Sequence, residues 1–452
     1  MKKFFLYFFV VCIGAFILLF DAFYNGFPIV YSDTSTYLSS GFELETPFDR
    51  PIMYGLFVRV FSLNGISLWF VVFTQAFILS LLIFLLTKEF FDSSLKQMLV
   101  GLLLITFITA FTGVSWVVSQ VMPDIFTSIG LLALMLILSN NLNKLHRVIL
   151  YFIYFLSLSM HMSHLMIFSG IILVLYFSSG YLPFKNNQIH KFKIKLLVLF
   201  SLTVLSFFTM NSSVSKSKHA FIMGAMLENG VLKPYLDEYC GKKLYKLCEY
   251  KDSLPDRAYK FLWDEDSPFY KLGGWKNTRS EFNLIIYDIL TTSKYILLTC
   301  KASLTATLLQ LQRFKVGDGN GKFDDGTLLF ERIRKYFNDE HLIFKRSLQN
   351  QEKLFAFIKV RNIMFYTITL ISAIGILISF FLKHYAYTFK FHVFTIFSGV
   401  LINAWCCGTF ANAIDRLGCK MMWLIVLMSG LILLKKIYSI IYNLNYSNVN
   451  SI

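Results

Sequence analysis

Carboxylates and histidines suited to acid–base chemistry stand beside apolar stretches of this 452-residue chain. Asp33 lies in Ser32-Asp33-Thr34, about ten residues after the first apolar stretch. A carboxylate placed there could deprotonate a hydroxyl or amine nucleophile. The same tripeptide is typical of a helix N-cap, so capping is the alternative role of Asp33.

Asp124 and two histidines also lie near the ends of apolar stretches. Asp124 follows a proline at the start of an apolar stretch, where an acid also suits the positive end of a helix. His161 and His164 are three residues apart, which places both rings on one side of a helix. Such a pair could bind a metal or a phosphate or transfer a proton, or it could only form hydrogen bonds. The catalytic candidates are therefore Asp33, Asp124, His161 and His164.

Three cations could hold the phosphate of a substrate. Arg50 follows Asp49, Arg416 follows Asp415, and Lys420 lies four residues after Arg416. A guanidinium can bind a phosphate through two parallel hydrogen bonds. The alternative for Arg416 is a local ion pair with Asp415 at the level of the lipid headgroups.

The long hydrophilic segment in the middle of the chain contains aromatic residues next to acids. Trp263, Asp264 and Trp275 suit sugar binding, because rings stack on sugars and acids accept hydroxyl hydrogen bonds, although the rings could equally pack inward. Cys240 and Cys248 could form a disulfide in an oxidising compartment, or remain two free thiols.

Nucleotide and metal motifs give no support for a cofactor. The glycine-rich stretch at 316–323 lacks the Ser or Thr of a P-loop and the spacing of a calcium loop, so it predicts a turn. We expect no cofactor. A divalent metal remains an option that no pair of neighbouring acids supports.

The composition predicts a membrane protein. Hydrophobic residues make up 56% of the chain and charged residues 15%, and the mean hydropathy is +0.58. A soluble domain could not bury so much apolar surface. The net charge of +16 would suggest nucleic acid in a soluble protein, but cytoplasmic loops of membrane proteins collect Lys and Arg. We therefore expect an all-α polytopic membrane protein with no nucleic-acid partner.

Ten segments have the length and apolarity expected of transmembrane helices. They lie at roughly 4–23, 67–87, 98–116, 121–139, 147–160, 163–181, 194–211, 363–382, 391–411 and 420–437. The first is interpreted as an uncleaved span, because it is longer than a signal-peptide core and lacks a good cleavage site. The fifth is the shortest, and its fusion with the sixth would move every later loop to the other side.

The distribution of Lys and Arg predicts the orientation. Alternate loops carry Lys2, Lys3, Lys88, Lys96, Lys144, Arg147, Lys185, Lys191, Lys193, Lys195, Lys383, Lys390, Lys435 and Lys436. With ten spans, these loops and both termini face the cytoplasm. The first loop, residues 24–66, and a region of about 150 residues at 212–362 then face outward. We expect a seven-span module at 1–211, an extracytoplasmic and mainly helical domain at 212–362, and a three-span module at 363–452.

This layout places all the candidate residues on the outer face of the membrane, and it resembles the GT-C superfamily of membrane glycosyltransferases. The resemblance rests on Ser32-Asp33-Thr34 in the first outer loop, an interfacial helix at 51–61, the seven-span module and the large outer insertion. It implies a polyprenyl-phosphate-linked sugar as donor and Asp33 as the base. Asp124, His161 and His164 match by position only, and Arg416 is assigned to the donor phosphate. The first loop has no adjacent acidic pair, which speaks against a metal-dependent subtype.

We therefore expect an inverting glycosyltransferase in the plasma (inner) membrane, with a glycan, lipid or protein as acceptor and membrane lipid around it. A transporter or flippase for a lipid-linked glycan is one alternative, although it would need polar groups nearer the bilayer midplane. A phospho- or acyl-group transferase that uses His161 or His164 is a second alternative. An assembly factor that docks through the outer domain is a third.

Overall fold

The computed structural model describes residues 2–139, 143–181, 186–381 and 387–449. These residues form helices and no β-strand, apart from an isolated bridge between Ile29 and Gln120. The predicted all-α class is therefore confirmed. Six of the described helices contain a stretch long and apolar enough to cross a bilayer. These stretches are Leu68–Thr87, Ser94–Phe111, Ile189–Met210, Phe357–Ser379, Thr388–Phe410 and Asp415–Ile440.

Each of the ten predicted spans coincides with a helix. They correspond in order to α1 (Lys2–Leu18) with α2 (Phe20–Asn25), α5 (Leu68–Thr87), α6 (Ser94–Phe111), α8 (Ile125–Leu138), α9 (Lys144–Ser159), α10 (Met162–Ser178), the first part of α11 (Asn186–Glu228), α20 (Phe355–Phe381), α21 (Tyr387–Phe410) and α22 (Asp415–Val449). Helices α8, α9 and α10 and the apolar part of α1, Phe5–Leu18, are shorter than 18 residues. The number of ten spans therefore stays a prediction.

Helix α8 lies inside the bundle. All fourteen of its residues are buried, so other helices and not lipid surround it. A helix that is apolar all round is expected in such a position. Because α8 is fixed on every side, the residue just before it, Asp124, has a well-defined place.

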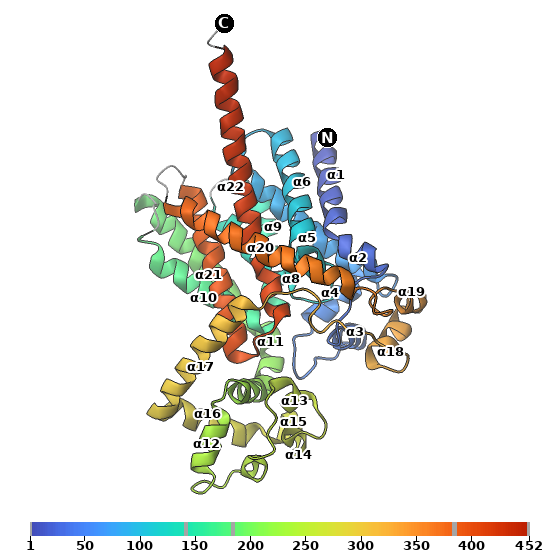
Figure 1. Ribbon diagram of the computed structural model, residues 1–452, viewed down its shortest axis with the longest axis vertical. Helices are drawn as coiled ribbons and strands as arrows, with labels where there is room; N and C mark the ends of the chain where they lie inside the picture. Colours follow the sequence, from blue (N-terminus) through green and yellow to red (C-terminus); the bar gives the residue numbers. More distant parts are fainter. Residues whose placement is uncertain (1, 140–142, 182–185, 382–386, 450–452) are drawn as a thin grey trace.

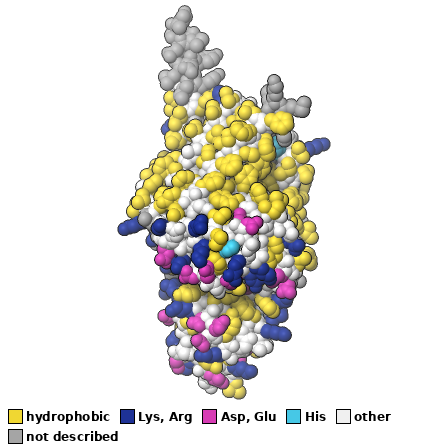
Figure 2. Space-filling view, turned by 90° about the vertical axis from the view of Figure 1, so that its right-hand side faces the viewer, with side chains coloured by type: hydrophobic (Ala, Val, Ile, Leu, Met, Phe, Trp, Pro, Cys, Tyr) yellow, Lys and Arg dark blue, Asp and Glu magenta, His cyan; other side chains and the backbone are white. Residues whose placement is uncertain are grey.

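The two ends of the described chain lie at one end of the molecule, and a small helical unit lies at the other (Figure 1). Figure 2 shows apolar side chains covering one half of the visible surface, with Lys, Arg, Asp and Glu gathered on the remainder. This arrangement is compatible with a multi-pass protein that has one large region outside the bilayer. The orientation stays a prediction. Two of the cations on which it rests, Lys185 and Lys383, lie outside the described residues.

The region 212–362, predicted as one domain, is divided between two hydrophobic cores. Helix α11 continues without a break past residue 211 and enters a separate small core with residues up to Ala302. We call this part the small helical unit. It contains α12 (Leu232–Tyr239), η1 (Lys246–Tyr250), α13 (Ala258–Trp263), α14 (Pro268–Lys271), α15 (Gly274–Asn277), α16 (Arg279–Thr291) and the start of α17 (Ser293–Gln312).

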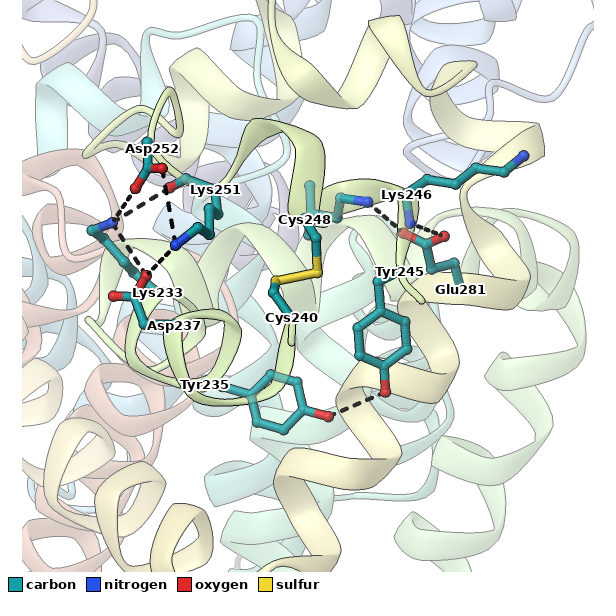
Figure 3. The surroundings of a disulfide bond; sticks show 11 residues. Lys233, Tyr235, Asp237, Cys240, Tyr245, Lys246, Cys248, Lys251, Asp252 and Glu281 are labelled. Carbon is teal, nitrogen blue, oxygen red and sulfur yellow. Dashed lines mark hydrogen bonds and ion pairs between the residues drawn. A yellow bond between two sulfur atoms is a disulfide. The ribbon is translucent and has the colours of Figure 1, made fainter. Parts of the chain in front are cut away.

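A disulfide closes a short loop in the small helical unit. Cys240 and Cys248 are bonded, with a Cα–Cα distance of 5.5 Å, and they join the end of α12 to η1 (Figure 3). Beside the disulfide, the hydroxyls of Tyr235 and Tyr245 lie 3.1 Å apart. Of the two alternatives considered for these cysteines, the structure contains the disulfide.

Another part of the region, residues 313–354, packs on the membrane helices and the first loop. Side chains of α18 (Leu328–Tyr336) and α19 (His341–Lys345) belong to the large core that also contains the transmembrane helices. Gln349 fixes this segment to the first loop, because its side chain donates to the Val30 carbonyl at 2.8 Å and accepts from the Val30 N–H at 3.2 Å. We call residues 313–354 the covering segment.

Two short helices of the first loop cross at paired glycines. These are α3 (Thr34–Glu43) and α4 (Met53–Phe61), the second of which corresponds to the helix predicted at 51–61. A Cβ atom on Gly41 would lie 2.1 Å from the carbonyl oxygen of Gly55, so the two backbones touch there. Small residues permit this close approach. It holds together the two helices that follow Asp33 and Arg50 in the sequence.

A buried ion pair joins a helix near the start of the chain to a helix in its last quarter. Asp21 in α2 pairs with Arg361 in α20, and both side chains are 2% exposed. The Arg361 guanidinium also donates to the Thr109 and Thr112 carbonyls at the end of α6, at 2.8–3.0 Å. A buried charge is tolerated when it is paired and hydrogen-bonded in this way.

We expect Arg361→Met to lower the free energy of unfolding in detergent by about 3–5 kcal/mol, because it leaves the Asp21 carboxylate buried without its cation. The matched control is Arg257→Met, which removes a half-exposed ion pair with Glu228 and should cost less than about 1 kcal/mol. Denaturant titration of the purified variants measures both values. Equal losses would contradict the structural role of the Asp21–Arg361 pair.

Candidate functional site

A short backbone pairing brings the first loop next to the start of α8. Ile29 forms two backbone hydrogen bonds of 2.9 Å with residues 119–121. The Thr34 hydroxyl donates to the Val121 carbonyl at 3.1 Å. The beginnings of α3 and α8, which are about 90 residues apart in sequence, are therefore held side by side.

Asp33 lies between two arginines that come from distant parts of the chain. Its Oδ1 atom is 3.2 Å from Nη1 of Arg50, and its Oδ2 atom is 3.2 Å from Nη1 of Arg416. The arginine side chains are 10% and 13% exposed and the Asp33 side chain is 27% exposed, so the group is largely buried but reachable. Asp33 makes no side-chain capping bond to α3, so capping does not explain this residue.

Asp124 lies on the other side of Arg416. Its two oxygens are 3.9 Å from Nε of Arg416 and 4.0 Å from Nζ of Lys420, both in the first turns of α22. Asp124 and Lys420 are 4% and 1% exposed. Asp124 makes no capping bond to α8. The alternative pairing of Arg416 with Asp415 is not observed, because Asp415 instead accepts a hydrogen bond from the backbone of Lys315 at 2.9 Å.

The charges of this group balance. Arg50 also pairs with Asp49, so the three carboxylates of Asp33, Asp49 and Asp124 face the three cations Arg50, Arg416 and Lys420. We call these six residues the charged cluster. An anionic ligand could enter only by taking cations away from their carboxylates.

The charged cluster keeps Asp33 ionised. Burial alone would raise the pKa of its carboxyl, but the charges of Arg50 and Arg416 and their hydrogen bonds outweigh burial and lower the pKa to about 2. A carboxylate held in this way is a weak base. It would become a stronger base when another anion occupied the two guanidinium groups.

His161 belongs to the electrostatic surroundings of the charged cluster. Burial lowers its pKa to about 3, and the positive charges of Lys420, Arg416 and Arg50 act in the same direction. Nδ1 of His161 accepts from the backbone N–H of Ser163 at 3.2 Å and so caps α10. Among the described residues, Nε2 has no hydrogen-bond partner. A neutral ring with one free nitrogen is available to a substrate.

His164 is placed differently from its neighbour. It is fully buried, with Nε2 2.8 Å from the Thr127 hydroxyl and Nδ1 2.6 Å from the Ser157 carbonyl. Nδ1 therefore donates to the carbonyl and Nε2 accepts from the hydroxyl. Because both nitrogens are occupied, the geometry favours a structural role for His164 over the catalytic role predicted for it.

The predicted sugar-binding residues belong to the small helical unit and not to the helices that carry the charged cluster. Trp263 and Trp275 lie with ring centroids 5.4 Å apart, and Trp275 packs edge-on against Phe269 at 5.1 Å. The inward packing considered as an alternative thus applies to Trp275. Trp263 is 47% exposed and Asp264 is exposed, so both remain accessible on the unit.

Two residues of the site, Tyr31 and Asp318, were not predicted from the sequence. The ring of Tyr31 lies 4.4 Å from the Arg416 guanidinium, and Asp318 accepts a hydrogen bond from the Arg416 backbone at 3.2 Å. Tyr31 stands two residues before Asp33, so its aromatic character next to an acid was a usable signal. No signal in the sequence indicated Asp318, because the pattern of its segment predicted only a turn.

The described residues contain no group of three or more His, Cys, Asp or Glu side chains that could hold a metal ion. What they do offer is a carboxylate for proton transfer, a neutral imidazole for hydrogen bonding, and three cations for a phosphate. Comparisons with protein-family models, curated proteins and solved structures found no match to this chain.

The two histidines should respond differently to substitution. We expect His164→Ala to lower the free energy of unfolding by about 1–3 kcal/mol for each buried partner left unsatisfied. His161→Ala should cost about 1 kcal/mol, the typical cost of losing a helix cap. Unfolding in detergent measures both. A larger loss for His161→Ala would contradict the assignment of His164 as structural.

Proposed function

We propose that this chain is an inverting glycosyltransferase of the GT-C type, which moves a sugar from a polyprenyl-phosphate-linked donor to an acceptor. In this proposal it crosses the plasma membrane ten times, with both termini in the cytoplasm and the charged cluster at the outer face. The main support is the position of Asp33 between Arg50 and Arg416, because a base and phosphate-binding cations meet there.

The donor phosphate would bind by exchanging with a carboxylate. Arg50 and Arg416 each have a guanidinium group that can bind a phosphate through two hydrogen bonds. Lys420 adds a buried positive charge held only loosely, 4.0 Å from Asp124. When the phosphate takes Arg50 and Arg416, Asp33 loses the partners that keep its pKa low.

The released Asp33 carboxylate would then act as the base. It takes the proton of the acceptor hydroxyl while the acceptor oxygen attacks the anomeric carbon of the sugar. The bond from that carbon to the phosphate oxygen breaks, and the phosphate leaves with the electron pair, so the configuration inverts. Arg50 and Arg416 stabilise the negative charge that develops on the leaving phosphate.

Two further parts of the chain would support the reaction. His161 has its Nε2 atom free for a hydrogen bond to a substrate hydroxyl, and its low pKa keeps it neutral. The small helical unit, with Trp263 and Asp264 at its surface, would contact the acceptor.

A flippase for a lipid-linked glycan is the second candidate. It would need polar groups near the bilayer midplane, whereas the buried pair of Glu89 and His392, 2.8 Å apart, lies beside Lys88 and Lys390 at the predicted cytoplasmic ends of the helices, which favours the transferase. The two candidates differ in outcome, since only a transferase forms a new glycosidic bond. A phosphoryl or acyl transferase would depend on His161 and not on Asp33.

Asp33→Asn should lower sugar transfer by about 100-fold to 10,000-fold, the usual contribution of a general base. The assay measures transfer from a panel of radiolabelled polyprenyl-phosphate sugars in membranes that contain the protein. Glu43→Gln is the matched control, because Glu43 lies in the same loop but pairs with Arg332 and Lys335. It should keep wild-type activity. Unchanged transfer by folded Asp33→Asn would refute the assignment of the base.

The pH profile should distinguish the free protein from the donor complex. In the free protein Asp33 is ionised above about pH 2 and His161 is neutral above about pH 3, so neither group changes kcat/KM between roughly pH 5 and 8. In the donor complex the pKa of Asp33 rises, so the acid limb of kcat moves to higher pH. A limb in kcat/KM near pH 6.5 that disappears in His161→Asn would contradict this account.

A further inference from the structure

Helix α19 of the covering segment is fixed to one end of α5. The carboxylate of Glu340, the residue before α19, accepts hydrogen bonds from the Ser67 hydroxyl and from the Leu68 N–H, the latter at 3.0 Å. Leu68 begins the stretch Leu68–Thr87, which is long and apolar enough to cross a bilayer. An acid at this place satisfies a free N–H group and suits the positive end of α5. The contact therefore holds α19 at the height where α5 would leave the hydrocarbon.

The residues of α19 and those just after it divide into a buried and an exposed set. Phe344 is fully buried in the large core. Leu342 and Ile343 are 54% and 48% exposed, and Lys345 and Arg346 are exposed as well. Large apolar side chains beside cations are the pattern of segments that lie at a lipid–water interface.

A neighbouring segment also exposes apolar side chains. Val60, at the end of α4, and Leu63 and Ile66, in the connection to α5, are 63%, 56% and 64% exposed. The covering segment touches this connection, because a Cβ atom on Gly65 would lie 2.7 Å from the carbonyl oxygen of Tyr336. Single exposed apolar residues are ordinary, but here two adjoining segments expose five of them beside the start of α5. We call these five residues the apolar rim: Val60, Leu63, Ile66, Leu342 and Ile343.

The surroundings of the apolar rim favour lipid as its partner. Figure 1 shows α19 at the right-hand edge of the molecule. Figure 2 looks onto that side, where a band of charged side chains borders the apolar half of the surface. Lys345 and Arg346 carry the positive charge that attracts anionic headgroups. Lys345 pairs with Asp325 at 2.6 Å, but this pair is exposed, so a lipid phosphate could replace it at little cost. A bilayer around α5 would therefore meet the apolar rim and both cations together.

We propose that the apolar rim, with Lys345 and Arg346, is a docking surface for anionic lipid, in which α19 lies among the headgroups and Leu342 and Ile343 reach the acyl chains. The proposal requires that α5 crosses the membrane. It does not depend on sugar transfer, and it applies to whichever side of the membrane holds this end of α5.

Docking on lipid would restrain the first loop through the residues that follow α19. The backbone N–H of Leu348 donates to the Asn25 carbonyl at 2.9 Å, and the Gln349 side chain donates to the Val30 carbonyl at 2.8 Å. Val30 stands three residues before Asp33. Lipid bound at α19 would thus help to hold the charged cluster in place.

The test measures how deep α19 lies in the bilayer. A nitroxide spin label is attached to Ile343→Cys in the full chain, in nanodiscs of phosphatidylglycerol. The background carries Cys12→Ala and Cys300→Ala, because these two free cysteines are not buried. We expect the label to be more accessible to oxygen, which concentrates in the bilayer, than to a water-soluble nickel chelate. Leu342→Cys provides a second position if Ile343→Cys does not fold.

Matched controls separate lipid contact from simple exposure. Leu244→Cys carries a fully exposed label in the loop that the disulfide closes, and this label should prefer the nickel chelate. Lys345→Gln combined with Arg346→Gln should raise the accessibility of the label at residue 343 to the chelate by about twofold or more, since each basic residue strengthens binding to an anionic surface about fivefold. Lys251→Gln, in the small helical unit, should leave it unchanged.

Three results would overturn the docking surface. One is a label at residue 343 that prefers the nickel chelate as strongly as the label at residue 244, which would mean that α19 stands in water. Another is magnetic coupling between the labels of two copies, which would assign the apolar rim to a second copy of the chain. The third is an unchanged accessibility after both charge changes, which would exclude anionic headgroups as partners. Failure of the proposed function affects none of these results, because no sugar transfer is measured.

Discussion

The ion pairs of Asp33 with Arg50 and Arg416 are the interactions on which the rest of the site depends. A largely buried carboxylate is costly unless cations and hydrogen bonds compensate it, and here the compensation comes from two places 17 and 383 residues away in the sequence. The chain must therefore hold the first loop and the start of α22 together with little freedom. The same balance explains why an anion is the natural ligand, since only another negative charge can replace Asp33 at little electrostatic cost.

Backbone pairing and the covering segment supply the rigidity that these ion pairs require. The bridge at Ile29 fixes the first loop to the start of α8, and Gln349 fixes the same loop to the covering segment. The close contact of Gly41 with Gly55 sets the position of α3 on α4. Because these supports come from separate parts of the chain, the site forms only when the whole bundle is assembled, whereas the small helical unit has a core of its own.

The sequence predicted the helices well and their long-range contacts only in part. Apolar runs determine helices locally, so each predicted span coincides with one. Charge placement also put Asp33, Arg50, Asp124, Arg416 and Lys420 on one face, and the structure brings these five together. The division of the region 212–362 and the partner of Asp21 were not predictable, because core packing and the pairing with Arg361 depend on contacts between distant residues. The role of His164 likewise depends on Thr127 and Ser157, which no spacing indicates.

The most direct test of the central claim is a structure of the protein with polyprenyl phosphate bound. We expect phosphate oxygens to lie within hydrogen-bonding distance of both Arg50 and Arg416, about 2.7–3.2 Å, with Asp33 released from at least one of them. A phosphate bound elsewhere, with both ion pairs of Asp33 intact, would contradict it.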